Sequence, residues 1–207
     1  MGETIERFPL FPLGMVLLPG EVVPLHIFED RYKQMIEECS EAESEFGVLW
    51  MGDEGLRQVG CTATITQLLD RMEDGRTNIL VQGGAAFRLE RRIDDMDYPA
   101  GHIELLDDEP ADDEESGAAA REEYANLVEL VTDSRPDETD VAELDSYGMA
   151  ATIALELAAK QQLLELRSES ARLEHLSSLL AEARDRYTYS EHAAEEAKSN
   201  GKPRRSA

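Results

Sequence analysis

The chain has 207 residues and a formal net charge of −25, because 45 aspartate and glutamate residues face only 20 lysine and arginine residues. Hydrophobic residues make up 42% of the sequence, enough for one large domain or two small ones with a buried core. So acidic a chain repels nucleic acid and anionic membrane surfaces, which bind through clustered lysine and arginine. The one compact basic cluster is Lys202-Pro203-Arg204-Arg205, at the C-terminal end. We therefore expect neither nucleic acid nor a membrane as partner.

The cysteines and the N-terminal residues indicate the compartment. Cys39 and Cys61 are the two cysteines, and no Cys-x-x-Cys motif occurs. One disulfide is possible in principle, but we expect two half-buried reduced thiols. Residues 1–6 lack the basic start and apolar core of a signal peptide, and no apolar run is long enough to span a bilayer. We expect a soluble, cytoplasmic protein.

Residues 1–108 have the pattern of a β-rich domain. A short helix is predicted over residues 30–38, from the apolar stripe of Tyr32, Met35 and Ile36. The turn residues Glu73-Asp74-Gly75 predict a hairpin, and Gly83-Gly84 predicts a break before the next strand. The predicted strands cover residues 8–19, 22–28, 46–51, 59–67, 78–82, 86–93 and 102–106.

The composition changes after the last predicted strand. Residues 109–117 are too acidic to pack, and we interpret them as a solvated linker, since they lack the spacing and the glycine of a Ca²⁺-binding loop. Residues 118–187 have helical periodicity and predict a small bundle that leans on the β-rich domain. Within it, Asp140 with Glu143 forms a possible capping box. Residues 188–207 are polar and are expected to be a disordered tail.

The opening segment resembles the N-terminal domain of Lon proteases. The resemblance starts with Phe8–Leu13 (FPLFPL) and Val16–Gly20 (VLLPG), and continues through Val22–Tyr32 (VVPLHIFEDRY) with the spacing of that family. These motifs are architectural, because prolines bend strands, glycines form turns, and leucine, valine and phenylalanine fill a core.

Later segments extend the resemblance to roughly residues 5–185. Matching strand and helix segments are Phe46–Val48, Val59–Ala63, Asp74–Val81, Phe87–Leu89, Gln162–Leu166, Arg172–Leu173 and Leu179–Leu180. The resemblance implies an α+β fold, a PUA-like β pseudo-barrel followed by a small C-terminal helical bundle. It also implies a role in recognising protein substrates or partners, and a related domain occurs in cereblon-type adaptors.

The sequence lacks the motifs of the catalytic parts of Lon. A phosphate-binding loop needs G-x-x-x-x-G-K-[ST], but the one lysine that follows a glycine is Lys202, and Glu196 stands where the first glycine would be. A serine–lysine peptidase needs a further domain. We therefore predict a protein that is not an enzyme, with no catalytic, cofactor-binding or metal-binding residues.

Several residues are candidates for a functional role. His26 is expected to be a hydrogen-bonded structural residue, and no histidine pair has the spacing of a helical zinc site. Glu29-Asp30-Arg31 is expected to cap a helix and form ion pairs. Gly83-Gly84 could approach a ligand closely, although a turn or bulge is the commoner explanation. Trp50 and Met51 are the candidates for an exposed binding spot, with packing in the core as the alternative.

Two functions are favoured by the resemblance and the absent catalytic motifs. The first is a non-catalytic module that binds unfolded or partly folded polypeptide. The second is an adaptor for a dedicated folded partner, such as a protease or its regulator. An RNA-related role of a PUA-like fold is opposed by the charge, and an undetected hydrolase would have to show activity that survives purification.

Overall fold

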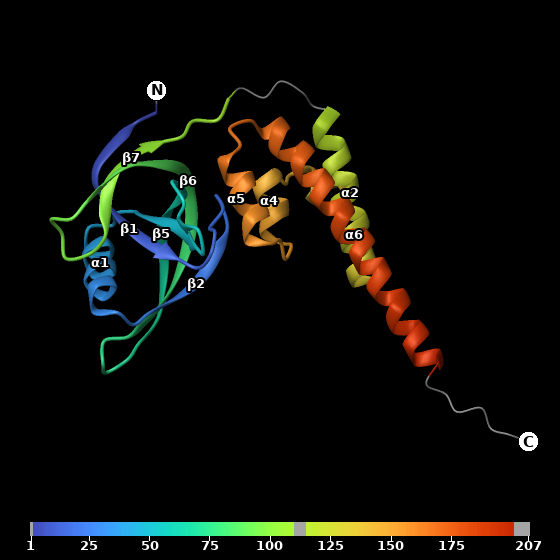
Figure 1. Cartoon of the computed structure of the whole chain (residues 1–207), viewed down its shortest axis with the longest axis horizontal. Helices are drawn as coiled ribbons and strands as arrows, with labels where there is room; N and C mark the ends of the chain where they lie inside the picture. The colour runs from blue at the N-terminus through green and yellow to red at the C-terminus, as the bar shows by residue number, and fades with distance from the viewer. Residues whose placement is uncertain (1, 110–114, 201–207) are drawn as a thin grey trace, which may run out of the picture.

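The computed structural model describes residues 2–109 and 115–200, with side chains described in 2–109 and 117–190. Figure 1 shows a β-barrel at one end of the molecule and a group of helices at the other. Two of these helices lie side by side, and the longer one, α6, points away from the barrel. The predicted class, a β pseudo-barrel followed by a small helical bundle, is confirmed.

Seven strands and one helix form the barrel. In chain order they are β1 (Thr4–Leu13), β2 (Val22–Ile27), α1 (Asp30–Glu41), β3 (Phe46–Gly52), β4 (Gly55–Leu56), β5 (Val59–Arg71), β6 (Thr77–Ile93) and β7 (Ala100–Leu105). The sheet runs β1-β7-β6-β5-β3-β4, and a parallel pairing between β1 and β3 closes the ring. Strand β2 pairs with β6 outside this ring.

Two clusters of buried apolar side chains stabilise the barrel. The smaller one joins β1, β3, β6 and β7 through Phe8, Leu10, Leu49, Phe87, Leu89 and Ile103. The larger one includes the inner face of α1 and continues into the helices. Both cysteines are buried free thiols. Burial raises the pKa of the Cys61 thiol, so this side chain behaves as a small apolar core residue.

The predicted break at Gly83-Gly84 is wrong, because β6 is continuous from Thr77 to Ile93. The two glycines instead allow close approach within the chain. A Cβ atom on Gly83 would stand 2.0 Å from the carbonyl oxygen of Leu18, and one on Gly84 would stand 2.4 Å from Thr62 Oγ1. Gly83 also donates to the carbonyl of Glu21 and accepts from Gly20. Gly83 therefore packs against the loop before β2.

The helical part consists of α2 (Glu115–Thr132), α3 (Glu138–Ala142), α4 (Ser146–Ala151), α5 (Leu157–Glu165) and α6 (Glu169–Asn200). The capping box predicted at Asp140 and Glu143 is wrong, since Asp140 lies within the first turn of α3 and Glu143 follows the end of that helix. The capping residue is Asp145, whose carboxylate accepts from the backbone N–H of Gly148 at 2.6 Å and begins α4.

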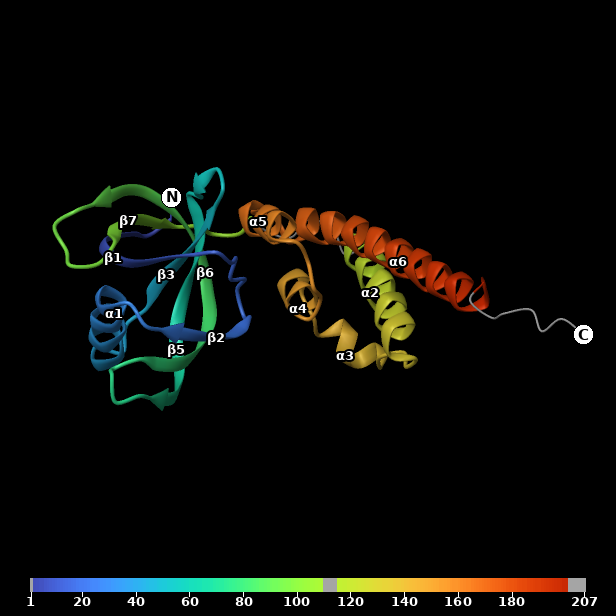
Figure 2. The same cartoon turned by 60° about the horizontal axis from the view of Figure 1, so that its bottom comes forward.

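Helix α5 joins the helical part to the barrel, as Figure 2 shows. Lys160 Nζ lies 2.5 Å from Glu21 Oε1, and both side chains are largely buried. Gln161 donates to the carbonyl oxygen of Val59 at 3.1 Å. Beneath these contacts, Leu163 and Leu164 belong to the same apolar cluster as the barrel core. The bundle therefore shares its core with the barrel.

The boundaries of the predicted linker and tail differ from the structure. Helix α2 already begins at Glu115, within the predicted linker 109–117, and residues 110–114 lie outside the described residues. Helix α6 continues through 188–200, where a disordered tail was predicted, and 201–207 lie outside the described residues. Residues 188–200 are rich in alanine and glutamate, which favour helix, and Gly201 and Pro203 come only after the helix end.

Candidate functional site

The barrel carries a groove between α1 and the hairpin of β5 and β6, which we call the α1–hairpin groove. It has a volume of about 350 Å³. Its apolar lining combines residues of β2, α1, β5 and β6: Ile27, Ile36, Ile65, Leu68 and Ile79. Apolar side chains of another molecule can bind in such a groove, because their transfer from water to an apolar surface is favourable.

Charged side chains span the groove toward the hairpin tip and hold its two walls together. Arg71 Nη2 of β5 lies 3.0 Å from Glu37 Oε1 of α1. Lys33 Nζ of α1 donates to the carbonyl oxygen of Asp74 in the hairpin turn at 3.2 Å. Gly75, with φ of +80°, gives that turn its shape, as the Asp-Gly motif predicts. Ser40, Glu41 and Thr77 line the groove as well, so it combines apolar side chains with polar and charged ones.

Helix α1 is held on the barrel by its apolar face. Tyr32, Met35, Ile36 and Cys39 are buried, at the spacing that predicted this helix. The Tyr32 ring packs on Phe11 of β1, with 4.3 Å between centroids. Tyr98 donates to Glu38 Oε2 at 2.6 Å, and this hydrogen bond is the main cause that lowers the pKa of Glu38. The helix wall of the groove is thus fixed on both sides.

Strand β5 offers apolar side chains and an unpaired edge beside the groove. Leu68 is 58% exposed and Leu69 is 47% exposed. In the described part of the chain, β3 pairs with β5 only over residues 61–63, so 64–71 have β6 on one side and no strand on the other. An open edge with exposed leucines can pair with an extended segment of another chain.

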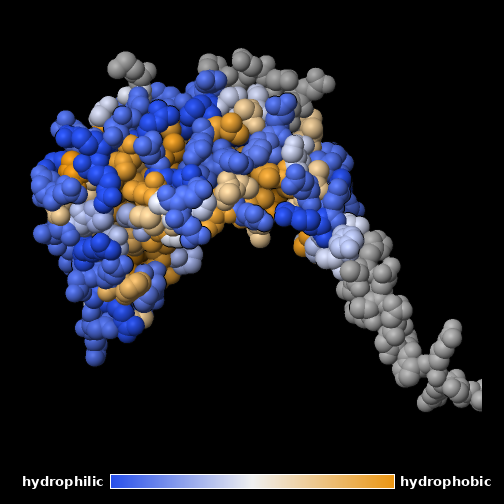
Figure 3. Space-filling view, in the orientation of Figure 1, coloured by the Kyte–Doolittle hydropathy of each residue, from blue (hydrophilic) through white to orange (hydrophobic). Residues whose placement is uncertain are grey.

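Further apolar side chains are exposed near the groove and elsewhere on the barrel. Phe28, between β2 and α1, is 58% exposed, and its ring stacks on His26 at 5.9 Å. Val22 on β2 is exposed as well. Figure 3 shows apolar patches on the barrel and along the inner side of the bend toward the helices, within a mostly hydrophilic surface.

The structure places the candidates Trp50 and Met51 on β3, and neither lines the groove. Trp50 is partly buried against the core, and the Arg57 guanidinium lies 5.2 Å from its ring centroid. Met51 is 44% exposed and pairs with Leu56 of β4. The two candidates therefore border the β3–β4 hairpin, apart from the groove.

The other candidate residues form local structural contacts. His26 Nδ1 lies 2.6 Å from Asn78 Oδ1, so this exposed side chain is hydrogen-bonded as expected. Glu29 stands before α1 and pairs with Arg31 at 2.7 Å, without a side-chain cap hydrogen bond. Within residues 2–109 and 117–190, no three histidine, cysteine or acidic side chains gather as a metal site would require.

Sequence reasoning did not identify Leu68, Leu69 or the groove. The predicted strand ended at Gln67, one residue before the exposed leucines. The available signal was the run Gln67-Leu68-Leu69-Asp70, in which two leucines continue a strand toward a polar turn. The groove itself is formed by segments far apart in the sequence, so periodicity within one segment cannot show it.

No helix in the described residues is long and apolar enough to cross a membrane.

A comparison with known proteins shows two solved structures that resemble this fold. A Lon N-terminal domain protein from Xanthomonas campestris has a TM-score of 0.65 and 26% identity, over 84% of this chain and 98% of that one. The N-terminal domain of a Mycobacterium avium complex Lon protease has a TM-score of 0.63 and 23% identity, over 88% and 98%, and this likeness concerns the fold alone.

Curated relatives agree with the structures. A Lon protease of Roseiflexus castenholzii is 27% identical over 92% of this chain, and one of Parabacteroides distasonis is 31% identical over 54%. The chain spans about a quarter or less of the length of these relatives, since the matches cover 26% and 14% of them. A family model described as the ATP-dependent protease La (LON) substrate-binding domain matches residues 7–182. The chain therefore belongs to the family of Lon substrate-binding domains.

Proposed function

We propose that this protein binds segments of other polypeptides that expose apolar side chains, and that it does so without catalysing a reaction on them. The observation that carries the proposal is the α1–hairpin groove, with its apolar lining and the exposed Leu68 at its edge. A volume of about 350 Å³ holds a few side chains, which suits a short extended segment.

The composition of the groove favours polypeptide over other ligands. The accessible apolar side chains of the groove are Ile65 and Leu68, since Ile27, Ile36 and Ile79 are at most 5% exposed. Apolar contacts of this kind form without demanding one sequence, as expected for the recognition of many unfolded segments. The unpaired edge of β5 adds backbone hydrogen bonds, which every polypeptide can form. The net charge of −25 opposes nucleic acid as a ligand.

A non-catalytic role is supported by the chemistry of the groove. Three of its four charged residues, Lys33, Glu37 and Arg71, are engaged in ion pairs or hydrogen bonds, and the fourth, Glu41, is an exposed carboxylate on α1. A general base or nucleophile needs a side chain that is free to exchange a proton with a substrate. The groove therefore supports binding better than catalysis.

The proposal is tested with one small disulfide-bonded protein in two states, native and reduced with blocked thiols, each carrying the same fluorophore. Fluorescence anisotropy is recorded as this protein is titrated in. We expect binding of the reduced state and none of the native state. Because apolar burial drives it, the affinity should persist when the salt concentration is raised.

The variant Leu68→Ser tests the groove, and Val131→Ser is its control, because both side chains are more than half exposed but Val131 lies on α2. Loss of a leucine contact of about 1.5 kcal/mol should weaken binding about tenfold for Leu68→Ser and leave Val131→Ser unchanged. Equal affinity for the two client states, or equal weakening by the two variants, would contradict the proposal.

A further inference from the structure

Three neighbouring arginines of β6 stand outside the ion pairs formed among the described residues. Among the described residues, most arginine side chains have a carboxylate at ion-pair distance. Arg88, Arg91 and Arg92 have none, and all three lie within five residues of β6. In a chain where acidic residues outnumber basic ones by 45 to 20, three neighbouring arginines without a carboxylate partner are exceptional.

These arginines form one surface with Arg57, which we call the arginine face (Arg57, Arg88, Arg91 and Arg92). Arg57 and Arg88 line a hollow of about 530 Å³. Arg57, Arg91 and Arg92 line a second hollow of about 210 Å³. Arg57 therefore joins the two hollows, and Leu56 lines both.

Neighbouring side chains orient two of the four guanidinium groups. Arg57 lies over the Trp50 ring and also pairs with the exposed Glu54 at 2.7 Å. Arg91 Nη2 lies 3.1 Å from His102 Nε2 on β7, so the histidine nitrogen accepts a hydrogen bond from the guanidinium. Guanidinium groups held by rings lose less conformational freedom when they bind a carboxylate.

We propose that the arginine face binds a carboxylate-rich segment of a partner protein. A guanidinium group binds a carboxylate through two parallel hydrogen bonds, and four of them in one area can hold several acidic side chains. The positive charge of the arginine face complements an acidic partner. The rest of this protein, whose net charge is −25, repels such a partner. Leu56, which is partly exposed, lines both hollows and can contact an apolar side chain between the acidic ones.

A protein segment suits this face better than nucleic acid. Carboxylates of the chain itself interrupt the arginines, with Glu165 in the first hollow and Glu90 in the second. A nucleic-acid strand carries a phosphate at every nucleotide and would meet these carboxylates. A peptide can place acidic residues opposite the arginines and other residues opposite Glu90 and Glu165.

The arginine face lies apart from the α1–hairpin groove. In Figure 2 the β3–β4 hairpin stands at the top of the barrel, and the tip of the β5–β6 hairpin lies at the bottom. The two surfaces can therefore be occupied independently. The proposal goes beyond the proposed function, because it concerns another surface and a partner of different chemistry.

The test uses a fluorescent peptide of alternating glutamate and leucine residues, titrated with the full chain at low and at physiological salt. Binding should weaken as salt rises, because it depends on charge. The double variant Arg88→Gln with Arg92→Gln should weaken binding about tenfold or more. The control, Arg7→Gln with Arg186→Gln, changes the net charge equally at two exposed arginines that already have partners.

The outcomes separate this proposal from the groove. Support requires that the control pair and Leu68→Ser retain peptide binding while the Arg88 and Arg92 variant loses it. The proposal is overturned if the peptide does not bind at low salt, if the control pair weakens binding equally, or if a single-stranded oligonucleotide of equal charge binds more tightly. None of these results depends on whether unfolded clients bind in the groove.

Discussion

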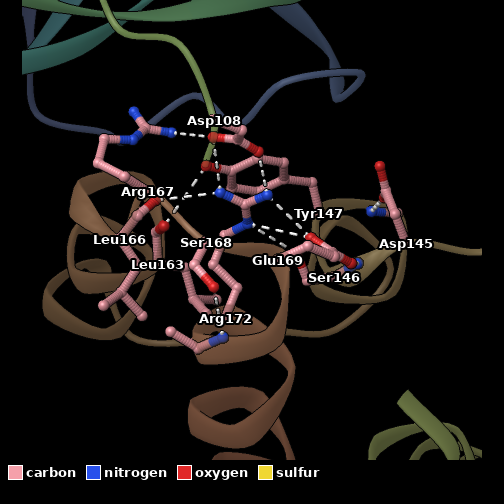
Figure 4. A network of polar contacts seen from close by, with 12 residues as sticks. Asp108, Asp145, Ser146, Tyr147, Leu163, Leu166, Arg167, Ser168, Glu169 and Arg172 are labelled. Carbon is pink, nitrogen blue, oxygen red and sulfur yellow. Dashed lines mark hydrogen bonds and ion pairs between the residues drawn. The ribbon is translucent and has the colours of Figure 1, made fainter. Parts of the chain in front are cut away.

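The guanidinium of Arg172 donates to both carboxylate oxygens of Asp108, 64 residues earlier in the chain, with 3.0 Å between Nη1 and Oδ1. Asp108 follows the last barrel strand and Arg172 lies in the first turn of α6, so the pair joins the two parts of the molecule (Figure 4). Arg172 also pairs with Glu169 and donates to the Leu166 carbonyl and to Ser146. With its side chain only 3% exposed, Arg172 is the centre of this network.

Removal of the Arg172 guanidinium should destabilise the whole chain. In Arg172→Met, a side chain of similar length leaves Asp108 and Glu169 without their shared partner. We expect the free energy of unfolding to fall by about 3 kcal/mol, the lower end for a buried pair, because both carboxylates keep some access to water. Urea denaturation followed by circular dichroism measures this change.

The matched control for that experiment is Arg186→Met. Arg186 lies on the same helix, but its ion pair with Glu156 is long, at 3.6 Å, and both side chains are well exposed. This substitution should change the free energy of unfolding by less than about 0.5 kcal/mol. A similar fall in the free energy of unfolding for both variants would show that Arg172 contributes no more than an exposed arginine does.

The stability of this network should depend on pH through Asp108. Burial acts to raise the pKa of this carboxyl, but Arg172, with Arg167, outweighs burial and holds the pKa below its ordinary value. The unfolded chain then takes up the proton first, so the stabilisation is complete above the unfolded pKa of about 4 and is lost as the pH falls through the lower folded value.

The variant Asp108→Asn isolates this effect, because asparagine does not titrate. The difference in unfolding free energy between the wild type and the variant should be constant from about pH 5 to 7 and should shrink below about pH 4. Denaturation curves at a series of pH values give this difference. A difference that stays constant down to pH 2 would contradict the assignment.

The close approach of Gly83 to the loop before β2 should make that position intolerant of a side chain. In Gly83→Ala the added methyl would collide with the Leu18 carbonyl, which is backbone and cannot rotate away. We expect a loss of about 2 kcal/mol or more in unfolding free energy. Gly14→Ala is the control, since a Cβ atom there meets nothing within 4 Å. It should be neutral, or stabilising by up to about 1 kcal/mol.

The sequence predicted those features that depend on neighbouring residues. The stripe of Tyr32, Met35 and Ile36 predicted α1, and the Asp-Gly motif predicted the hairpin, because each pattern acts within a few residues. The pseudo-barrel came from the family resemblance, since the parallel pairing of β1 with β3 is not visible in either strand alone.

Features that depend on distant segments could not be predicted in this way. The glycines at 83 and 84 have the local signature of a break, and only the Leu18 carbonyl and the Thr62 hydroxyl explain why small residues stand in a continuous strand. Asp108 was the last residue of the predicted β-rich domain, but Arg172 makes it a link to the helices. The candidate groove likewise depends on distant segments, because residues of β2, α1, β5 and β6 form its walls.

Binding of unfolded polypeptide in the α1–hairpin groove should cover backbone amides of β5 and α1. Amide hydrogen exchange with and without a saturating unfolded client tests it most directly, since exchange slows where backbone becomes covered or hydrogen-bonded. We predict slower exchange at 64–71 of β5 and at 33–41 of α1, with the helices α2 and α6 unchanged. Slower exchange confined to α2 and α6, or no change anywhere while the client is bound, would contradict binding in the groove.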